Sequence, residues 1–254
     1  MYVGGGAAWP PSHECRCFAA TIAAMTSALD EALPGCPGAA TLEGVALACR
    51  RGDRLLFSGL DISVAPGQIV WLRGSNGRGK TSLLRMLAGL SAPESGELRW
   101  AGQPLRDAGA AYSASLLYIA HGNALKDDLS AIETLAFLAQ LHDQDSSEDA
   151  LMQALQRLGM RSRCDAPVRT LSQGQRRRVA LARLALAPRK PLWLLDEPYD
   201  ALDDEACRVV DDLLRAHARS GGSVVLTSHL PLTISDPMPT TLALRDIEAE
   251  ALPA

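Results

Sequence analysis

Runs of consecutive apolar residues alternate along this chain with segments whose apolar residues recur every three or four positions. An apolar run of roughly four to eight residues between turn residues is typical of a buried strand, whereas the longer spacing indicates a helix. We expect buried strands at Ile69–Leu72, Leu116–Ala120, Leu192–Leu195 and Ser223–Ser228. We expect helices at Ser82–Ala88, Ser147–Leu158, Arg176–Ala187 and Asp204–Arg219. Together the two patterns predict an α/β protein.

Shorter pieces flank these elements. Before the first buried strand, the segments around Leu42, Val45 and Leu47, then Leu55–Phe57 and Leu60–Val64, suit short strands. The turns expected between them are Arg51-Gly52-Asp53 and Ala65-Pro66-Gly67. Two more strands are predicted at Gly96–Trp100 and Thr240–Arg245. In the middle of the chain, Ser130 and Glu133 have the spacing of a capping box at the start of a helix, whose apolar face continues with Leu135, Leu138 and Leu141.

The first part of the chain has a different composition from the rest. It contains the breakers Gly4-Gly5-Gly6, Trp9-Pro10-Pro11 and Pro34-Gly35-Cys36-Pro37-Gly38, and its cluster His13-Glu14-Cys15-Arg16-Cys17 fits no zinc-ligand spacing. We expect residues 1–40 to be a disordered N-terminal extension. We expect residues 41–246 to form the folded domain, with a helical subdomain at about 123–187, and residues 247–254 to be a C-terminal tail.

Composition and charge exclude several classes of protein. The 254 residues are 47% hydrophobic, and no apolar run approaches the roughly 20 residues that cross a bilayer. The net charge of −4 gives no general attraction to nucleic acid or to an anionic membrane surface. Six scattered cysteines favour free thiols in a reducing cytosol over a disulfide framework.

The clearest chemical signal is the glycine-rich segment after the predicted strand Ile69–Leu72. It fits the pattern G-x-x-x-x-G-K-[ST] at every fixed position, with the residues Gly74, Ser75, Asn76, Gly77, Arg78, Gly79, Lys80 and Thr81. A helix follows directly, so backbone amides and the helix N-terminus together form a cradle for a polyphosphate. We expect Lys80 to reach the β- and γ-phosphates and the Thr81 hydroxyl to bind Mg²⁺. The sequence therefore predicts binding of a nucleoside triphosphate.

Three further residues at the ends of predicted strands complete a hydrolytic site. Asp196 and Glu197 follow Leu192–Leu195, and His229 follows Ser223–Ser228. Asp196 suits a Mg²⁺ site opposite Thr81, and Glu197 suits the general base that activates the attacking water. His229 is placed to donate a hydrogen bond to the γ-phosphate, although a purely structural role is equally open from the residues alone.

Five ordered motifs of this chain resemble those of the ATP-binding cassette (ABC) ATPases. They are Gly74–Thr81, Leu171–Gln175, Leu194–Pro198, Ala201-Leu202-Asp203 and His229. The resemblance covers about residues 41–246 and implies a P-loop NTPase of the ABC ATPase type. Such a fold has a mixed or parallel sheet core, an antiparallel β subdomain and a small helical subdomain. The resemblance also implies ATP and Mg²⁺ as cofactors, with Glu197, Lys80 and His229 in catalytic roles.

The same resemblance implies a head-to-tail dimer in which two copies sandwich two ATP molecules. Ser172 and Gly174 would contact the γ-phosphate on the partner's loop, with Gln175 in the same ATP contact, and Asp203 would connect the two sites. Gln173 stands where the family has its second glycine. We interpret Arg176-Arg177-Arg178 as a solvated helix face rather than a nucleic-acid patch, because the chain has no wider basic surface.

A narrower resemblance is to the haem exporter ATPases of bacterial cytochrome c maturation. It rests on Leu56-Phe57-Ser58-Gly59-Leu60, on the segment His121–Leu135 and on the compact C-terminus. It implies an ATP-hydrolysing transport subunit, peripheral to the cytoplasmic face of the inner membrane, that energises integral membrane subunits. Haem and a periplasmic haem chaperone would be indirect partners, and nucleic acid would not be one.

Two positions depart from the ABC pattern. Where the family usually has a glutamine that helps to ligate Mg²⁺, this chain has Gly122 beside His121, so water fills that ligand position or His121 partly substitutes. The usual adenine-stacking aromatic is absent from Cys49-Arg50-Arg51-Gly52. There an arginine plane is able to stack on the base through a cation–π contact worth about 0.5–2 kcal/mol.

Three alternative functions remain open. The nearest is the ATPase subunit of another small ABC exporter, for a lipid, drug or ion, which the identity of the membrane partner would distinguish. A soluble ABC ATPase acting on DNA or ribosomes is disfavoured, because this chain has one set of motifs and only a short insert. An inactive regulatory subunit is disfavoured because Lys80, Asp196, Glu197 and His229 are all present.

Overall fold

The computed structural model describes residues 41–244 of the chain. The strands are β1 (Leu42–Arg51), β2 (Arg54–Val64), β3 (Ile69–Arg73), β4 (Ser95–Trp100), β5 (Gln103–Pro104), β6 (Leu116–Ile119), β7 (Leu192–Leu195), β8 (Ser223–Thr227) and β9 (Thr240–Ala243). The helices are α2 (Lys80–Leu87), α3 (Leu105–Ser115), α4 (Ala131–Leu141), α5 (Glu148–Arg157), α6 (Gln173–Leu181), α7 (Arg183–Leu186) and α8 (Asp204–Arg219). Short 3-10 helices lie at Arg161–Arg163 and Val168–Thr170. The predicted extension (residues 1–40), the predicted tail (residues 247–254) and Arg245 lie outside the described residues.

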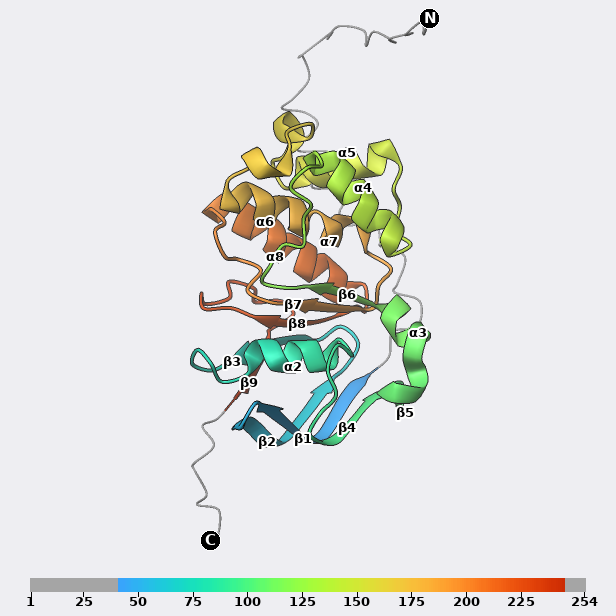
Figure 1. Ribbon diagram of the computed structural model, residues 1–254, viewed down its shortest axis with the longest axis vertical. Coiled ribbons are helices and arrows are strands. Elements are labelled where there is room, and N and C mark those ends of the chain that lie inside the picture. Colours follow the sequence, from blue (N-terminus) through green and yellow to red (C-terminus); the bar gives the residue numbers. More distant parts are fainter. Residues whose placement is uncertain (1–40, 245–254) are drawn as a thin grey trace, which may run out of the picture. The chain divides into compact units, whose positions relative to one another are not determined.

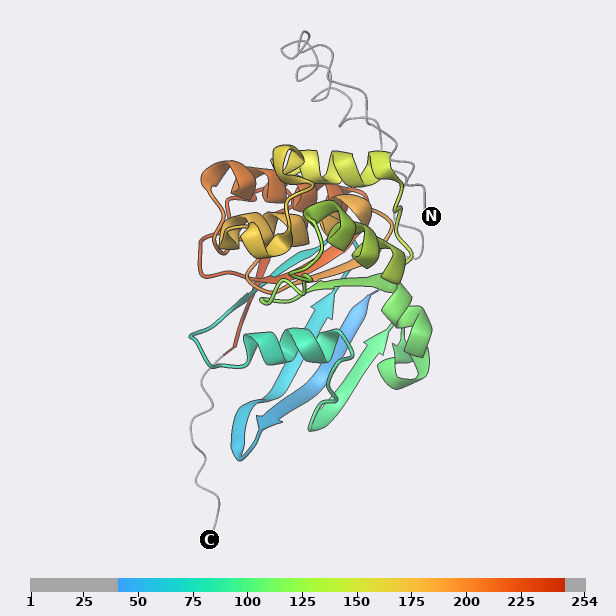
Figure 2. The same cartoon turned by 45° about the horizontal axis from the view of Figure 1, so that its top comes forward.

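Two sheets organise the described part of the chain. One is antiparallel with strand order β2-β1-β4-β5, and the other is parallel with order β6-β7-β8-β3-β9. Helix α2 lies between the two sheets, and α4 to α8 cover the opposite face of the parallel sheet (Figure 1). The turned view in Figure 2 shows the long antiparallel strands side by side, with α2 crossing in front of them. The α/β fold with an antiparallel β part and a helical part is confirmed.

Strand β7 of the parallel sheet is buried on both faces, as its continuous apolar sequence predicts. Leu192 and Leu194 of β7 belong to the core cluster between the sheets, whereas Trp193 and Leu195 belong to the cluster beneath the helices. This alternation follows from the two-residue repeat of a strand. Because neither face meets water, both faces select large apolar side chains. The strand therefore ends abruptly where Asp196 introduces the first charge.

The antiparallel sheet contains irregularities that the sequence did not indicate. The two pieces predicted at Leu55–Phe57 and Leu60–Val64 form one strand, β2, so their separation was wrong. Between them Gly59, at φ 60°, absorbs a shift in the register with β1. A bulge is the usual way to carry an extra residue without ending a strand. A second shift lies at Ala46 of β1, which has φ 50°.

The helices begin at caps that the sequence indicates well. Ser130 and Glu133 form the predicted capping box of α4, and Ser147 caps α5. A second capping box joins Ser172 to Gln175, so α6 begins at Gln173 rather than at the predicted Arg176. The predicted single helix to Ala187 is divided into α6 and α7, and α3 was not predicted. Within residues 41–244, none of the helices has the length and apolar character required to span a bilayer.

Candidate functional site

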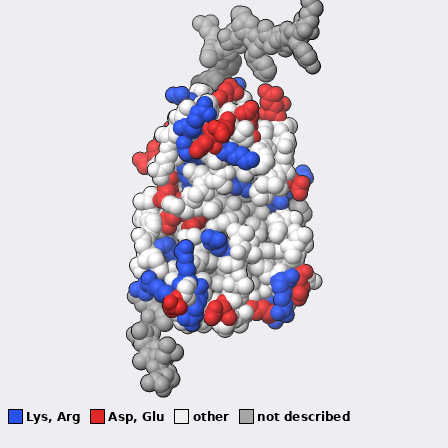
Figure 3. All heavy atoms as spheres, viewed as in Figure 1, with Lys and Arg blue, Asp and Glu red and all other residues white. Residues whose placement is uncertain are grey.

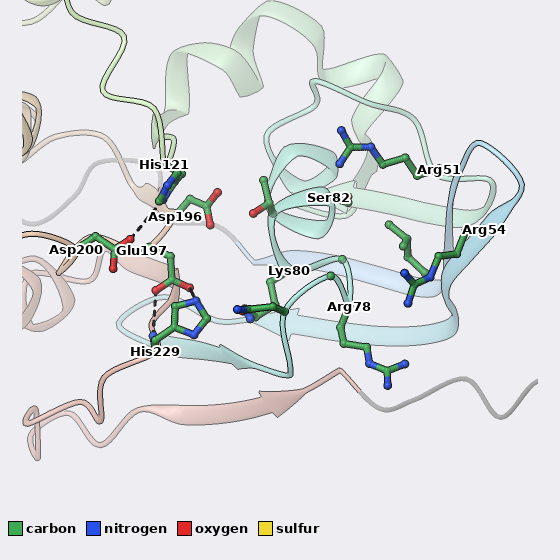
Figure 4. Close-up of a pocket in the computed structure, with 15 residues that line it drawn as sticks. Arg51, Arg54, Arg78, Lys80, Ser82, His121, Asp196, Glu197, Asp200 and His229 are labelled. Carbon is green, nitrogen blue, oxygen red and sulfur yellow. Dashed lines mark hydrogen bonds and ion pairs between the residues drawn. The ribbon is translucent and has the colours of Figure 1, made fainter.

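A cavity of about 530 Å³ lies beside the phosphate loop, at the C-terminal ends of β7 and β8. Its wall includes Asn76–Thr81 from the loop and start of α2, and Asp196, Glu197 and His229 from the strand ends (Figure 4). Ligands of open parallel sheets bind at this edge. The structure thus brings together the two groups of residues that the sequence predicts for ATP and its hydrolysis.

The phosphate loop folds tightly around its own lysine. Lys80 is only 9% exposed, and its Nζ donates to the Gly74 carbonyl oxygen at 2.7 Å. Gly79 has φ 93°, and a Cβ there would lie 3.1 Å from Cβ of Leu56 in β2, so glycine is required. The first turn of α2 contains no acidic residue. Its amides and dipole are therefore free to favour an anion.

Gly74 and Ser75 support the loop from outside the cavity lining. Gly74 supplies the carbonyl that holds Lys80, and the Ser75 hydroxyl accepts a hydrogen bond from Nε of Arg78 at 3.0 Å. Both residues were predicted as part of the ATP site. In this structure they shape the loop, whereas Asn76 to Thr81 line the space beside it.

Asp196 has one oxygen held and one oxygen free of partners. Its Oδ1 accepts a hydrogen bond from the Thr227 hydroxyl at 2.9 Å. Its Oδ2 is buried and has no hydrogen-bond partner in the part of the chain that the structure describes. A buried carboxylate oxygen without a partner is costly, unless a cation or an ordered water completes it. The side chain therefore fits the Mg²⁺ position predicted opposite Thr81, which lines the same cavity.

Glu197 is held by His229 through two atoms. The backbone amide of His229 donates to Oε2 of Glu197 at 3.0 Å, and Nε2 of His229 lies 3.3 Å from Oε1. The Glu197 backbone amide donates to the Thr227 hydroxyl at 2.8 Å. Thr227 was missed from the sequence, although its position at the end of β8, two residues before His229, was a usable signal. These contacts fix the carboxylate at the cavity wall.

His121 and Gly122 stand where the ABC pattern has its glutamine. His121 lines the cavity, and its Nδ1 lies 3.5 Å from Oδ2 of Asp200. At Gly122 an added Cβ would meet no atom within 4 Å in the described structure. The space for a larger side chain therefore exists, and steric crowding does not explain the glycine.

The cavity is electrically polarised along its length. The cations Arg51, Arg54 and Arg78 stand toward one end, the carboxylates of Asp196, Glu197 and Asp200 stand toward the other, and Lys80 lies between them (Figure 4). Positive side chains also gather over the region of α2 and β2 in Figure 3. Such a field attracts a polyanion to the loop and leaves the carboxylates for a cation and water. Arg54 was not predicted, and among the described lining residues no Phe, Tyr or Trp occurs.

The remaining predicted ATP-binding residues do not line this cavity. Ser172, Gly174 and Gln175 lie at the start of α6, and Asp203 caps α8. Gln175 Oε1 accepts a hydrogen bond from the Ser172 amide at 3.0 Å, so this side chain contacts its own helix. The amide of Ala206 donates to Asp203 and, more than any other contact, lowers the pKa of that carboxyl. The cavity and these four residues form two separate parts of the candidate site.

The interpretation of Arg176-Arg177-Arg178 as a solvated face is wrong for its middle residue. Arg177 is 2% exposed, whereas the side chain of Arg176 is 34% exposed and lies 3.2 Å from a carboxylate oxygen of Asp127. Arg178 contacts Asp203. Successive residues of a helix point about 100° apart, so three in a row cannot share one exposed face. The sequence did contain a signal for this burial, which was missed. Arg177 has helical spacing to the buried residues Leu181 and Leu184, so it lies on the same face of the helix as they do.

Comparison with known proteins places the chain in a family. The family model described as ABC transporter matches residues 57–200. A solved ATP-binding subunit of an ABC transporter superposes with a TM-score of 0.70 at 23% identity, over 80% of this chain and 85% of that one. An ATP-binding cassette solved as a dimer in a post-hydrolysis state with ADP and Pi gives 0.65 at 21% identity, over 74% and 88%. The chain belongs to the ABC transporter family.

Curated relatives narrow this placement. The cytochrome c biogenesis ATP-binding export protein CcmA of Aromatoleum aromaticum is 48% identical over 203 residues, covering 80% of this chain and 94% of that protein. The protein of the same name from Dechloromonas aromatica is 46% identical over 193 residues, covering 76% and 94%. CcmA of Pseudomonas putida is 47% identical over 188 residues, covering 74% and 89%. The predicted resemblance to ATPases of cytochrome c maturation is confirmed.

Proposed function

We propose that this chain hydrolyses ATP as the nucleotide-binding subunit of an exporter that serves c-type cytochrome assembly. The observation that carries the proposal is the single cavity that joins the phosphate loop to Asp196, Glu197 and His229. Lys80 and Thr81 line it from the start of α2, and Asp196 and Glu197 line it from the end of β7. A phosphate-binding cradle facing a general base is the arrangement that phosphoryl transfer to water requires.

The residues divide the chemistry between binding and proton transfer. The loop amides and the Lys80 ammonium bind the β- and γ-phosphates. Thr81 and Asp196 would hold Mg²⁺, which would supply positive charge to offset that of the phosphates. Glu197, oriented by His229, accepts the proton of the attacking water. Within residues 41–244 no three His, Cys, Asp or Glu side chains are grouped to bind a metal, so the phosphates and water are needed to complete the coordination.

The second part of the site acts on the nucleotide of a second copy. Ser172, Gly174 and Gln175 lie outside the cavity, at the N-terminus of α6 where amides favour an anion. In a head-to-tail pair they contact the γ-phosphate held by the partner's loop, and Asp203 lies near both sites. The solved post-hydrolysis cassette with 21% identity is itself dimeric. One copy alone therefore hydrolyses ATP slowly.

The export role in the proposed function is inferred from the similarity to the curated relatives. Their printed names describe ATP-binding export in cytochrome c biogenesis. We assign to this chain the energising of integral membrane subunits from the cytoplasmic face of the inner membrane. Haem and a periplasmic haem chaperone are its indirect partners, and the ATP-driven step is release of the loaded chaperone.

Rescue of cytochrome c assembly tests the proposal. Cells that lack this gene receive the wild type, Glu197→Gln or an empty vector, with equal protein levels verified by immunoblot. We expect the wild type alone to restore haem-bearing cytochromes. Intact cytochromes in cells without the gene would refute the cytochrome assignment and leave an ABC ATPase of another exporter. Full rescue by Glu197→Gln would refute the role of the general base.

A further inference from the structure

One buried arginine connects α6 to the ends of two strands at the cavity. Nη2 of Arg177 donates to the carbonyl oxygens of Asp196 at 2.7 Å and Glu197 at 2.8 Å. Nη1 donates to the carbonyl oxygen of Ala120 at 2.9 Å and to Oδ1 of Asn123 at 3.1 Å. Ala120 follows β6, and Asp196 follows β7. A single guanidinium thus ties three segments of the chain together.

The chemistry of these contacts is unusual for a residue that only fills space. All four acceptors are neutral oxygen atoms, so the charge of Arg177 is not balanced by a direct carboxylate contact. Burial lowers the pKa of this guanidinium, although nearby acidic groups oppose the change. An apolar side chain of similar volume is often at least as favourable for stability as a buried charge. What arginine adds is a rigid planar fork that fixes several acceptors at once.

The backbone conformation of Glu197 needs hydrogen bonds of this kind to hold it. Its φ is 49°, in the left-handed region that a residue with a Cβ seldom adopts. Its amide donates to the Thr227 hydroxyl at 2.8 Å, and its carbonyl accepts from Arg177. The peptide groups on both sides of its Cα are therefore held, and these determine where the side chain points. Strained residues persist where their surroundings over-determine them, and they gather at functional sites.

A second contact joins the same helix to the same segment. At Gly174, in the first turn of α6, an added Cβ would lie 2.5 Å from the carbonyl oxygen of Ala201. The helix backbone therefore lies directly against the chain that follows Glu197. Together with Arg177, this contact means that α6 and residues 196–201 are attached at two points.

We propose that Arg177 is a positioning residue, which sets the direction of the Glu197 carboxylate and couples it to α6. The proposal rests on the proposed function, in which Glu197 is the general base and Ser172 at the start of α6 faces the partner's nucleotide. A displacement of α6 on contact with that nucleotide is transmitted through the guanidinium to the base of its own cavity. The nucleotide at one site of the pair thereby affects the position of the general base at the other site.

A double-mutant cycle in the full-length chain tests this role. Arg177→Lys keeps the charge and loses the fork, and we expect kcat for ATP hydrolysis to fall about 10- to 100-fold, since small displacements of catalytic groups have effects of this size. KM for ATP and the affinity for a fluorescent ATP analogue stay within about twofold, because the loop is untouched. In the Glu197→Gln background, Arg177→Lys lowers the residual rate no further, because its only target is already lost.

Arg183→Lys is the matched control. Arg183 lies in the adjacent helix α7, is 5% exposed, and makes no hydrogen bond to Asp196 or Glu197 within the described residues. We expect its variant to keep kcat within about twofold of the wild type, whatever it costs in thermal stability. Arg177→Gln, an uncharged second variant, is expected to reproduce the loss of kcat seen with Arg177→Lys.

Each other outcome decides against one of the two proposals. An unchanged kcat, or an equal fold-loss in the Glu197→Gln background, overturns the positioning role. Failure of both Arg177 variants to fold or to bind nucleotide, while Arg183→Lys does both, also overturns it and makes Arg177 a structural requirement. A wild type without ATPase activity, or a Glu197→Gln variant as fast as the wild type, refutes the proposed function instead.

Discussion

The two parts of the candidate site differ in how much of their surroundings the chain itself provides. Around the cavity, three residues predicted to act in catalysis or metal binding have an internal partner: Lys80 the Gly74 carbonyl, Glu197 the His229 amide, and Asp196 the Thr227 hydroxyl. At the start of α6, the side chains of Ser172 and Gln175 each accept a hydrogen bond from the other's backbone amide. The first part is braced to receive a ligand, and the second presents a helix N-terminus whose residues lie outside that cavity.

This difference indicates how the work is divided between two copies. A group that acts within its own chain is oriented by hydrogen bonds to that chain, because preorganisation lowers the reorganisation needed in the transition state. A group that acts on a partner needs only a rigid element that projects it, and α6 with its capping box is such an element. Variants of the cavity residues should therefore fail in their own site, whereas a variant of Ser172, at the start of α6, should fail in the partner's.

The largest effect is expected from the cavity. Glu197→Gln removes the proton acceptor while keeping the size of the side chain, so ATP hydrolysis should fall about 10²–10⁴-fold. Binding of ATP should persist, because no loop contact changes. Steady-state phosphate release and equilibrium nucleotide binding measure the two quantities. The control is Glu148→Gln in the exposed first turn of α5, which should leave both unchanged. A loss of ATP binding in Glu197→Gln would contradict the assignment of a purely chemical role.

The next effect is expected from α6. Ser172→Asn keeps a good N-cap residue but replaces the hydroxyl, and should lower hydrolysis by about 10²-fold, the usual cost of losing one preorganised donor. ATP binding to the isolated chain should not change. Ser147→Asn, the same substitution at the cap of α5, should leave hydrolysis unaffected.

Mixing these two inactive variants separates the two parts of the site. In a mixed pair of Glu197→Gln and Ser172→Asn chains, one site combines both defects and the other combines none. Random pairing should therefore restore about a quarter of the wild-type rate, because about half of the pairs are mixed and each has one working site. A mixture that stays as slow as its components would mean that Ser172 acts on the cavity of its own chain.

The sequence predicted the local motifs of the two parts of the site better than the contacts between residues that are distant in the chain. Local patterns were sufficient for the phosphate loop, the apolar strand before Asp196, the cap of α4 and the approximate start of α5, because each depends on neighbouring residues. Thr227 and Arg177 were missed because their partners lie 19 to 57 positions away in the chain. Which of three adjacent arginines turns inward depends on the packing of α6 against the sheet, and charge alone does not reveal it.

Other misses have the same origin. The strand β2 was divided in two because Gly59 reads as a break, whereas pairing with β1 continues the strand through it. Helix α3 was not expected, and its Gly109 has non-helical φ and ψ of 43° and −121°. Tertiary contacts thus override local preferences at both places. The roles given to Ser172, Gly174, Gln175 and Asp203 stay predictions.

A third variant tests the bracing of the cavity directly. Thr227→Val removes the hydroxyl that accepts from the Glu197 amide and donates to Asp196. A buried donor without its partner costs about 1–3 kcal/mol, so the free energy of unfolding should fall by this amount. Urea denaturation measures it, and Thr227→Ser, which keeps the hydroxyl, should recover most of the loss. Equal stability of Thr227→Val and wild type would show that the bracing contributes nothing.

The smallest effect is expected at the far end of the cavity, where the question is how the adenine base of ATP is bound rather than how the phosphates are bound. Arg51 and Arg54 line this end, and no Phe, Tyr or Trp does so among the described lining residues. If an arginine plane stacks on adenine, Arg51→Ala should weaken ATP binding by about 0.5–2 kcal/mol, and Arg51→Tyr should restore it.

The alternative is that the arginines act only as charges, and binding of different ligands distinguishes the two possibilities. Loss of stacking leaves the affinity for inorganic tripolyphosphate unchanged, whereas loss of charge weakens ATP and tripolyphosphate alike and does so less at high salt. Arg208→Ala, at an exposed position of α8 outside the cavity, should change neither affinity. Parallel titrations with ATP, GTP and tripolyphosphate therefore show whether this end of the cavity reads the base or only attracts the polyanion.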